Sequence, residues 1–131
     1  MFSRAGETLV LAHPNFETPH LWILVTDPVG QPPQTIIVAV STKRFYKDST
    51  VVLSPGDHPW VQHESVIFYD HALIPEVRHL NEAVRRRIAE LHQPCTPDVL
   101  RRVQDGLLSS PRTPQRVKHF YKDWLAKREK K

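Results

Sequence analysis

Five short apolar runs, separated by residues that break regular structure, occupy the first 75 positions of the chain. They are Leu9–Ala12, Leu21–Thr26, Thr35–Ser41, Val51–Leu53 and Ser65–Tyr69. The runs are rich in β-branched and aromatic residues, which favour strands. The intervening segments hold Pro, Gly and Asp in turn-forming combinations, and the segment 13–20, with two prolines, cannot be a regular strand. The pattern predicts a small antiparallel sheet that curls into a barrel over about residues 8–75.

After Pro75 the apolar positions take the period of helices. One helical face is formed by Leu80, Ala83, Val84, Ile88 and Leu91, and Pro94 ends that helix. Two more helices are predicted to begin at Thr96-Pro97 and Thr113-Pro114, because Thr is a frequent N-cap and Pro a frequent first helical residue. We therefore expect a mainly β fold with α-helices, in which three helices over about residues 79–129 follow the barrel.

Length and cysteine usage limit the class of protein. A chain of 131 residues is the size of one domain, here residues 1–131. No apolar run approaches the roughly 20 residues of a membrane span, and the first residues carry no apolar signal segment. The single Cys95 rules out an internal disulfide and fits a reducing compartment. We expect a cytoplasmic protein that is not in a membrane.

The net charge of +4 conceals two unlike halves. Residues 1–76 carry four basic and eight acidic side chains, a balance of −4, whereas residues 77–131 carry fourteen and six, a balance of +8. A basic half indicates an anionic partner such as nucleic acid or an acidic protein. It is equally consistent with an ordinary solvated helix surface.

The densest group of reactive side chains lies in and after the loop of residues 54–63. It comprises Asp57, His58, Trp60, His63, Asp70 and His71. Imidazoles titrate near neutral pH and serve in proton transfer, and a tryptophan ring can stack on an unpaired base. Three other interpretations stay open: Asp57 and His58 as local turn partners, Trp60 as a plug at the barrel end, and a zinc site of His58, His63 and Asp57. The five-residue spacing of the two histidines is not that of a helical zinc pair.

The succession of elements resembles the PemK/MazF-like toxin family. The resemblance covers about residues 8–109 and rests on the strand order, the closing helix and a loop similar to that of one subgroup. The quoted segments are Leu21–Asp27, Thr35–Thr42, Thr50–Leu53, Ser65–Asp70, Pro97–Ser109 and Gly56-Asp57-His58-Pro59-Trp60. The resemblance implies an SH3-like barrel that cleaves single-stranded RNA without metal or cofactor. It also implies a homodimer and an antitoxin protein that blocks the substrate groove.

Several positions match or replace residues of that family. Thr50 and Asp70 stand where the family has a threonine and an acidic residue, and Ser65 is placed with the substrate-binding residues. His20 stands in place of the family's important arginine, and a second arginine position falls at Phe68. Both cations are lost, although arginine is a natural clamp for a phosphate in transition.

Cleavage of RNA by transesterification needs a base, an acid and a cation. The resulting candidates for catalysis are His20, Thr50, His58, His63 and Asp70. The candidates for substrate binding are Lys43, Arg44, Asp57, Trp60 and Ser65, with Lys43 or Arg44 replacing the missing arginine. No metal ligand is assigned.

A non-catalytic function is the alternative. A barrel of charge −4 that lacks both arginines would repel a polyanion, so the loop 54–63 and the basic helices would instead bind a protein or nucleic acid. The position of the cations distinguishes the two functions: near His20 and His58 for the enzyme, on the helices for the binding module. The face formed by Phe120, Tyr121 and Trp124 adds apolar surface for the expected dimer.

Overall fold

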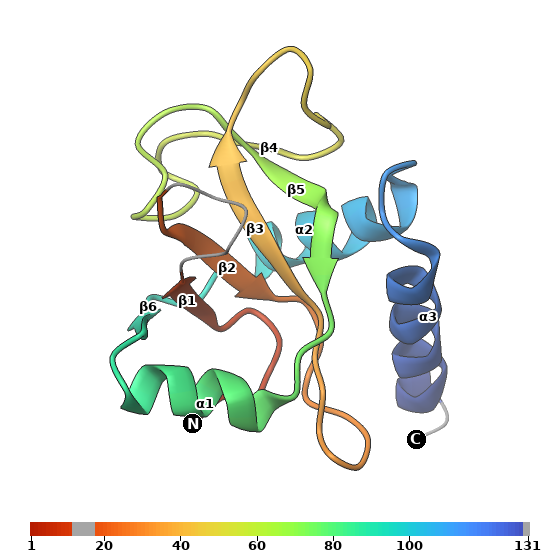
Figure 1. The fold of residues 1–131 in the computed structure, drawn as a ribbon. Coiled ribbons are helices and arrows are strands. Elements are labelled where there is room, and N and C mark those ends of the chain that lie inside the picture. Colours follow the sequence, from red (N-terminus) through yellow and green to blue (C-terminus); the bar gives the residue numbers. More distant parts are fainter. Residues whose placement is uncertain (12–17, 130–131) are drawn as a thin grey trace.

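The computed structural model describes residues 1–11 and 18–129. Residues 12–17 and 130–131 lie outside the described residues. They include Ala12 of the first predicted strand and the first five residues of the segment 13–20. The elements are β1 (Thr8–Leu11), β2 (His20–Leu24), β3 (Ile37–Thr42), β4 (Val52–Leu53), β5 (Ser65–Leu73), α1 (Val77–Arg85), β6 (Ala89–His92), α2 (Pro97–Ser109) and α3 (Gln115–Glu129), as Figure 1 shows. The five expected strands are confirmed, and the fold mixes strands and helices rather than being mainly β.

The strands form one antiparallel sheet of six strands. Their order is β4-β5-β3-β2-β1-β6, so the short β4 and β6 are the edges and the pairings leave the sheet open. In the middle of the sheet Trp22 lies opposite both Ala39 and Leu9. The pairing of β3 with β5 shifts register between Ile37 and Ala39, which marks a bulge.

The expected helix through Leu91 is wrong, because α1 ends at Arg85 and Ala89–His92 is strand β6. Arg87 adopts a left-handed backbone with φ 60°, which L-residues rarely adopt. The N–H of Ile88 donates to the carbonyl of Ala83 and that of Arg87 to the carbonyl of Val84, the paired bonds of a Schellman helix end. The chain then turns back and pairs with β1, which leaves Ile88 59% exposed.

Both faces of the sheet are covered by helices. On one face α1 packs over a cluster formed by Phe2, Leu9, Trp22, Leu24, Ile37, Ala39, Val77, Leu80 and Ala89. On the other face α2 and α3 pack over a larger cluster that includes Leu21, Ile23, Val38, Val40, Ile67, Tyr69, Val103, Leu107 and Trp124. Figure 1 shows α1 separate from α2 and α3. Burial on two sides explains why the β2 and β3 segments are apolar without alternation.

The two Thr-Pro helix starts differ in detail. The hydroxyl of Thr96 accepts a hydrogen bond from the N–H of Val99 and Asp98 lies in the first turn, as expected for the start of α2. Helix α3 also follows its Thr-Pro pair, but the buried hydroxyl of Thr113 has no hydrogen-bond partner among the described residues. The carbonyl of Pro114 instead accepts from the N–H groups of Val117 and Lys118. Thr113 is therefore not a side-chain cap.

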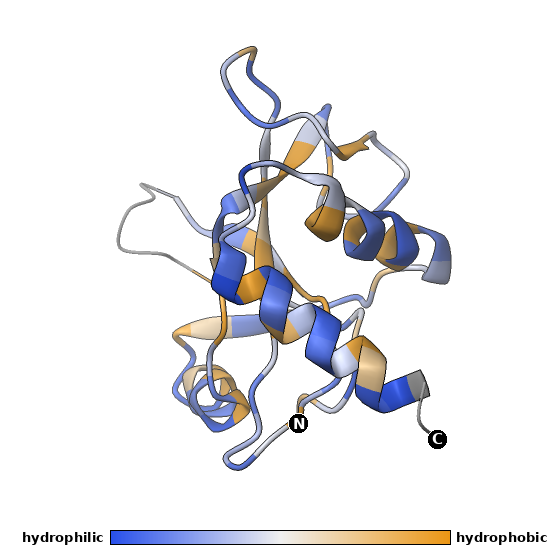
Figure 2. Ribbon diagram, turned by 90° about the vertical axis from the view of Figure 1, so that its right-hand side faces the viewer, coloured by the Kyte–Doolittle hydropathy of each residue, from blue (hydrophilic) through white to orange (hydrophobic). Residues whose placement is uncertain are grey.

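The aromatic side of α3 is buried against the chain's own core. Val117, Tyr121 and Trp124 are at most 4% exposed, and Figure 2 shows hydrophobic and hydrophilic segments alternating along this helix. A homodimer would therefore have to form through a surface other than the face of Phe120, Tyr121 and Trp124 that was expected from the sequence. Within the described ranges, none of the helices combines the length and hydrophobicity that a membrane span requires.

Candidate functional site

The first half of the loop 54–63 is a tight turn closed by Asp57. Its backbone N–H donates to the carbonyl of Ser54 at 3.0 Å, and its Oδ2 accepts from the N–H of Ser54 at 2.7 Å. Gly56 supplies a positive φ of 104° at the bend. The other oxygen, Oδ1, lies 3.5 Å from Nη1 of Arg102 on α2. Asp57 therefore fastens the turn, in line with the turn interpretation of the sequence.

His58 is a buried, neutral residue that holds the same loop in place. Its side chain is 3% exposed, Nε2 lies 2.6 Å from the carbonyl oxygen of Gln93, and Nδ1 lies 3.0 Å from the backbone nitrogen of Trp60. Because a carbonyl only accepts and an N–H only donates, Nε2 carries the proton. Burial lowers the pKa of His58, the Gln93 hydrogen bond opposes this, and the neighbouring His92 lowers it further. Both ring nitrogens are engaged, which favours a structural role.

Two other histidines, His20 and His63, line one groove at an end of the sheet. The groove has a volume of about 170 Å³, and its walls include His20, Ser41, Thr42, Trp60, His63 and Ser65. It lies where β2 begins, β3 ends and β5 begins. Four of the residues predicted from the sequence are thus brought together, although the first and last are 45 positions apart: His20, Trp60, His63 and Ser65.

The groove walls hold both imidazoles by hydrogen bonds. Nε2 of His63 lies 2.9 Å from the hydroxyl of Thr42, and the hydroxyl of Ser65 donates to the carbonyl of His63 at 2.9 Å. Thr42 and Ser65 are opposite each other in the sheet, so strand pairing fixes this wall. Nδ1 of His20 donates to the carbonyl of Val40 at 3.0 Å, so this nitrogen carries a proton. Two imidazoles that line one groove could act on the same bound molecule, one accepting a proton from it and the other donating a proton to it.

A cation beside this groove is Lys47, which is not among the site residues predicted from the sequence. Its ammonium donates to the hydroxyl of Ser41 at 2.7 Å and to the carbonyl of Thr42 at 3.0 Å, both on the groove wall. It also lies 5.8 Å from the centre of the Phe68 ring. Burial and, second, the charge of Arg44 lower the pKa of Lys47. Only its place in the basic cluster 43–47 could have drawn attention to it.

The two cations that the sequence favoured lie further out on the same loop. Lys43 is 3.6 Å from Glu64, with both side chains well exposed. Nη1 of Arg44 donates to the carbonyl of its neighbour Lys43 at 3.0 Å. Exposed ion pairs contribute about 0–1 kcal/mol to the free energy of unfolding, so the contacts of these two cations add little to stability.

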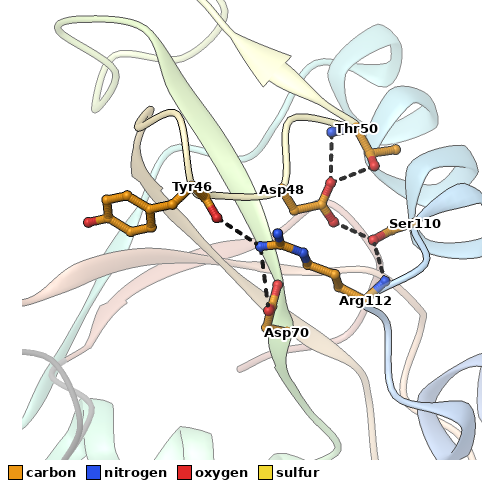
Figure 3. A network of polar contacts seen from close by, with 6 residues as sticks. All are labelled: Tyr46, Asp48, Thr50, Asp70, Ser110 and Arg112. Atoms are coloured by element: carbon orange, nitrogen blue, oxygen red, sulfur yellow. Dashed lines mark hydrogen bonds and ion pairs between the residues drawn. The ribbon is translucent and has the colours of Figure 1, made fainter.

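Thr50 belongs to a buried network around Asp48 rather than to the groove wall. Its N–H and hydroxyl donate to Oδ1 of Asp48 at 2.9 and 2.6 Å, and the hydroxyl of Ser110 donates to Oδ2, as Figure 3 shows. Burial acts to raise the pKa of Asp48, but the hydrogen bonds from Ser110 and Thr50 and the charge of Arg112 outweigh it, so the pKa is lowered. This network joins the loop before β4 to the connection between α2 and α3.

Asp70 takes part in the neighbouring contacts of Arg112. Nη1 of Arg112 lies 3.9 Å from Oδ2 of Asp70 and donates to the carbonyl of Tyr46 at 3.1 Å (Figure 3). Both side chains of the ion pair are partly exposed. Thr50 and Asp70 thus have evident structural partners, and neither is among the residues that line the groove of His20 and His63.

Two other chemistries find no support in the described residues. No group of three His, Cys, Asp or Glu side chains in residues 1–11 and 18–129 is arranged to hold a metal ion. Burial raises the pKa of the Cys95 thiol to about 12, which keeps it protonated at neutral pH.

No protein-family model, curated protein or solved structure matches this chain. The residues that line the groove include two histidines, four residues with hydroxyl groups and one tryptophan, and the ammonium of Lys47 lies beside it.

Proposed function

We propose that the protein binds single-stranded RNA in the groove of His20 and His63 and cleaves it without a metal, as a toxin-type endoribonuclease. One observation carries this proposal: both imidazoles line one groove whose wall is held by the ammonium of Lys47. These are the three parts that RNA transesterification requires, namely a base, an acid and a cation.

In the proposed reaction the ribose 2′-hydroxyl attacks the adjacent phosphorus atom. One histidine, as the neutral imidazole, accepts the 2′-hydroxyl proton, and the other, as the protonated imidazolium, gives a proton to the departing 5′-oxygen as the P–O5′ bond breaks. The products are a 2′,3′-cyclic phosphate and a free 5′-hydroxyl, so atoms and protons balance. Lys47 offsets the charge that develops on the phosphate oxygens.

The position of Lys47 supports its role as the missing cation. Some members of the resembled family use an arginine at the position of Phe68, and the Lys47 ammonium lies 5.8 Å from the centre of that phenylalanine ring. A cation delivered from the adjacent loop thus occupies the space near which the family's guanidinium is expected. This assigns to Lys47 the role that sequence reasoning gave to Lys43 or Arg44.

The rest of the family resemblance forms part of the same proposal. The open six-stranded sheet would be an SH3-like sheet in which α1 is inserted before the last strand. An antitoxin protein would inhibit the enzyme by covering the groove, and the protein would act as a homodimer in the cytoplasm. The order of β1 to β5 and α2, which follows the family's succession, is what supports these points.

Incubation of the purified protein with a long single-stranded RNA in EDTA tests the proposal. The His63→Ala protein should cut at least about 100-fold more slowly, the usual size of an acid–base contribution. His119→Ala, a change on the exposed side of α3, is the matched control and should leave the rate unchanged. Loss of cleavage on adding EDTA would indicate a metal enzyme, and full activity of His63→Ala would remove the groove from the mechanism.

A binding module remains the second candidate, and the distribution of charge favours it. Most cations of the basic half lie on the helices, including Arg101 on α2 and Arg116, Lys122 and Lys127 on α3. None of the residues lining the groove is a lysine or arginine. RNA or protein binding without any cleavage, abolished by Arg116→Gln with Lys122→Gln but not by His63→Ala, would support this alternative.

A further inference from the structure

The loop between β3 and β4 exposes two aromatic rings at its tip. Phe45 is 99% exposed and Tyr46 60%, and their ring centres are 5.5 Å apart in an edge-to-face arrangement at 87°. In Figure 1 this loop stands away from the sheet beyond the end of β3. A ring exposed to this extent gains almost nothing from burial on folding. Packing within the fold therefore does not explain why an aromatic residue occupies this position.

Cations flank the aromatic pair on both sides. Lys43 and Arg44 precede it and Lys47 follows it, and Figure 2 shows hydrophilic arms on either side of the tip. The acidic side chain of the same loop, Asp48, is already occupied by Thr50 and Ser110. The exposed end of the loop therefore presents positive charge together with aromatic surface.

The loop is held in position at several points. The N–H of Lys43 donates to the carbonyl of Glu64 at 3.1 Å, and the N–H of Lys47 donates to the carbonyl of Arg44 at 3.0 Å. Arg112 donates to the carbonyl of Tyr46 at 3.1 Å. The rings are thus presented on a backbone that is already ordered, which reduces the entropy lost when a ligand binds.

The loop is also continuous with the groove. Its first residues follow Thr42, a groove-wall residue, and Lys47 at its far side contacts Ser41 and Thr42. A strand with its reacting phosphate beside Lys47 would therefore pass next to the aromatic tip.

We propose that Phe45 and Tyr46 are a stacking platform for an unpaired base of the RNA strand as it leaves the groove. Lys43 and Arg44 contact the phosphates on either side of that base. Stacking on an aromatic side chain is sequence-tolerant because every base has a π-face. This inference rests on the proposed function, since it needs single-stranded RNA in the groove, and it adds a second contact region that determines affinity rather than chemistry.

Binding of a 12-nucleotide 2′-O-methyl oligouridine, fluorescein-labelled and resistant to cleavage, tests the platform by fluorescence anisotropy. Phe45→Ala should raise Kd about 5- to 100-fold, which corresponds to the loss of one stacked base. The matched control is Ile88→Ala, an exposed apolar residue at the other edge of the sheet, which should stay within about twofold of the wild type.

Salt dependence separates stacking from charge. The slope of log Kd against log salt concentration should be unchanged in Phe45→Ala. In Arg44→Gln it should fall by about 0.7, the loss of one phosphate contact on a single strand. An equal change of slope in both variants would overturn the assignment of stacking to Phe45.

The outcomes distinguish this inference from the proposed function. If the wild type cuts RNA and Phe45→Ala binds the oligonucleotide as tightly as the wild type, the platform is refuted and the nuclease stands. If the wild type neither binds nor cuts RNA, both are refuted. Vesicles of phosphatidylcholine with about one-third phosphatidylserine provide the last arm. Binding of wild type but not Phe45→Ala to these vesicles would make the tip a membrane contact instead.

Discussion

Nε2 of His58 lies 2.6 Å from the carbonyl oxygen of Gln93, and this contact ties the loop 54–63 to the segment between β6 and α2. It favours a structural role for His58, the most conspicuous histidine of the sequence, while His63, five positions later, lines the groove. Two histidines of one loop thus have different surroundings, and each leads to its own experiment.

The stability of the protein should depend on pH through His58. Its pKa lies below the ordinary 6.5 in the folded protein because the ring is buried. Below pH 6.5 the unfolded chain therefore binds a proton that the folded protein does not yet bind, and the free energy of unfolding falls as the pH drops. Urea unfolding at pH 7.5, 6.5 and 5.5 measures this fall. His58→Gln, which cannot titrate, should lose less stability over the same range, even though it is less stable at pH 7.5.

His119→Gln is the control for this series, because it removes a histidine from the exposed side of α3. It should keep the wild-type pH dependence. Parallel profiles for wild type and His58→Gln would show that His58 titrates normally in the folded protein.

Removal of the Lys47 charge should lower the rate of RNA cleavage. Lys47→Met keeps much of the side chain over Phe68 but cannot offset charge on the phosphate, so kcat should fall by about 10²- to 10³-fold. Lys43→Met, a change in an exposed ion pair, should leave kcat within about threefold and act mainly on KM. Rapid-quench cleavage of a labelled RNA measures both constants. Equal effects of the two substitutions on kcat would argue for a diffuse charge effect.

The buried carboxylate of Asp48 should be important for stability. Asp48→Asn replaces an acceptor of several hydrogen bonds with a group that can accept at only one atom, and we expect a loss of about 2–4 kcal/mol. Asp70→Asn disrupts only a long, partly exposed ion pair with Arg112 and should cost less than about 1 kcal/mol. Guanidinium unfolding of both variants at pH 7 checks the contrast. A smaller loss in Asp48→Asn than in Asp70→Asn would contradict the geometry of the network.

Substitution of Gly106 should destabilise the protein even though it lies inside α2. A Cβ atom there would overlap the hydroxyl of Tyr69 and a methyl of Val51, and the Tyr69 hydroxyl already donates to Val103. Overpacking costs about 3 kcal/mol at the upper end of its usual range, whereas alanine gains about 1 kcal/mol of helix propensity. We therefore expect Gly106→Ala to lose about 2 kcal/mol. Ser109→Ala, exposed on the same helix, should change stability by less than about 0.5 kcal/mol.

Local signals were sufficient for much of the fold. The apolar, β-branched runs predicted the first five strands, and the Thr96-Pro97 pair predicted the start of α2 because capping depends on neighbours within one helical turn. Strand β6 was missed because its residues continue the helical spacing of α1. The helix ends instead at a left-handed arginine, Arg87, where glycine would have been the usual signal.

The site was harder to predict because its decisive contacts are long-range. Gln93, which accepts the His58 hydrogen bond, lies 35 positions away, so the loop sequence alone could not tell the buried histidine from the accessible one. The choice of Lys47 over its two neighbours likewise depends on how the loop folds back onto Ser41. The residue types indicated which chemistry was available, but only the packing of distant segments indicated which of these residues lie together in the groove.

The bond from Ser110 to Asp48 joins segments that are 62 positions apart. Residues so joined should open together when the native protein fluctuates, since neither can leave without breaking the buried network. The amide proton of Thr50, which lies next to Asp48, should then exchange with solvent at the same free energy of opening as the amides of Val117 and Lys118 in the first turn of α3. The loop that carries Phe45 and Tyr46 would thus share one cooperative unit with the C-terminal helix rather than fluctuate as an independent segment.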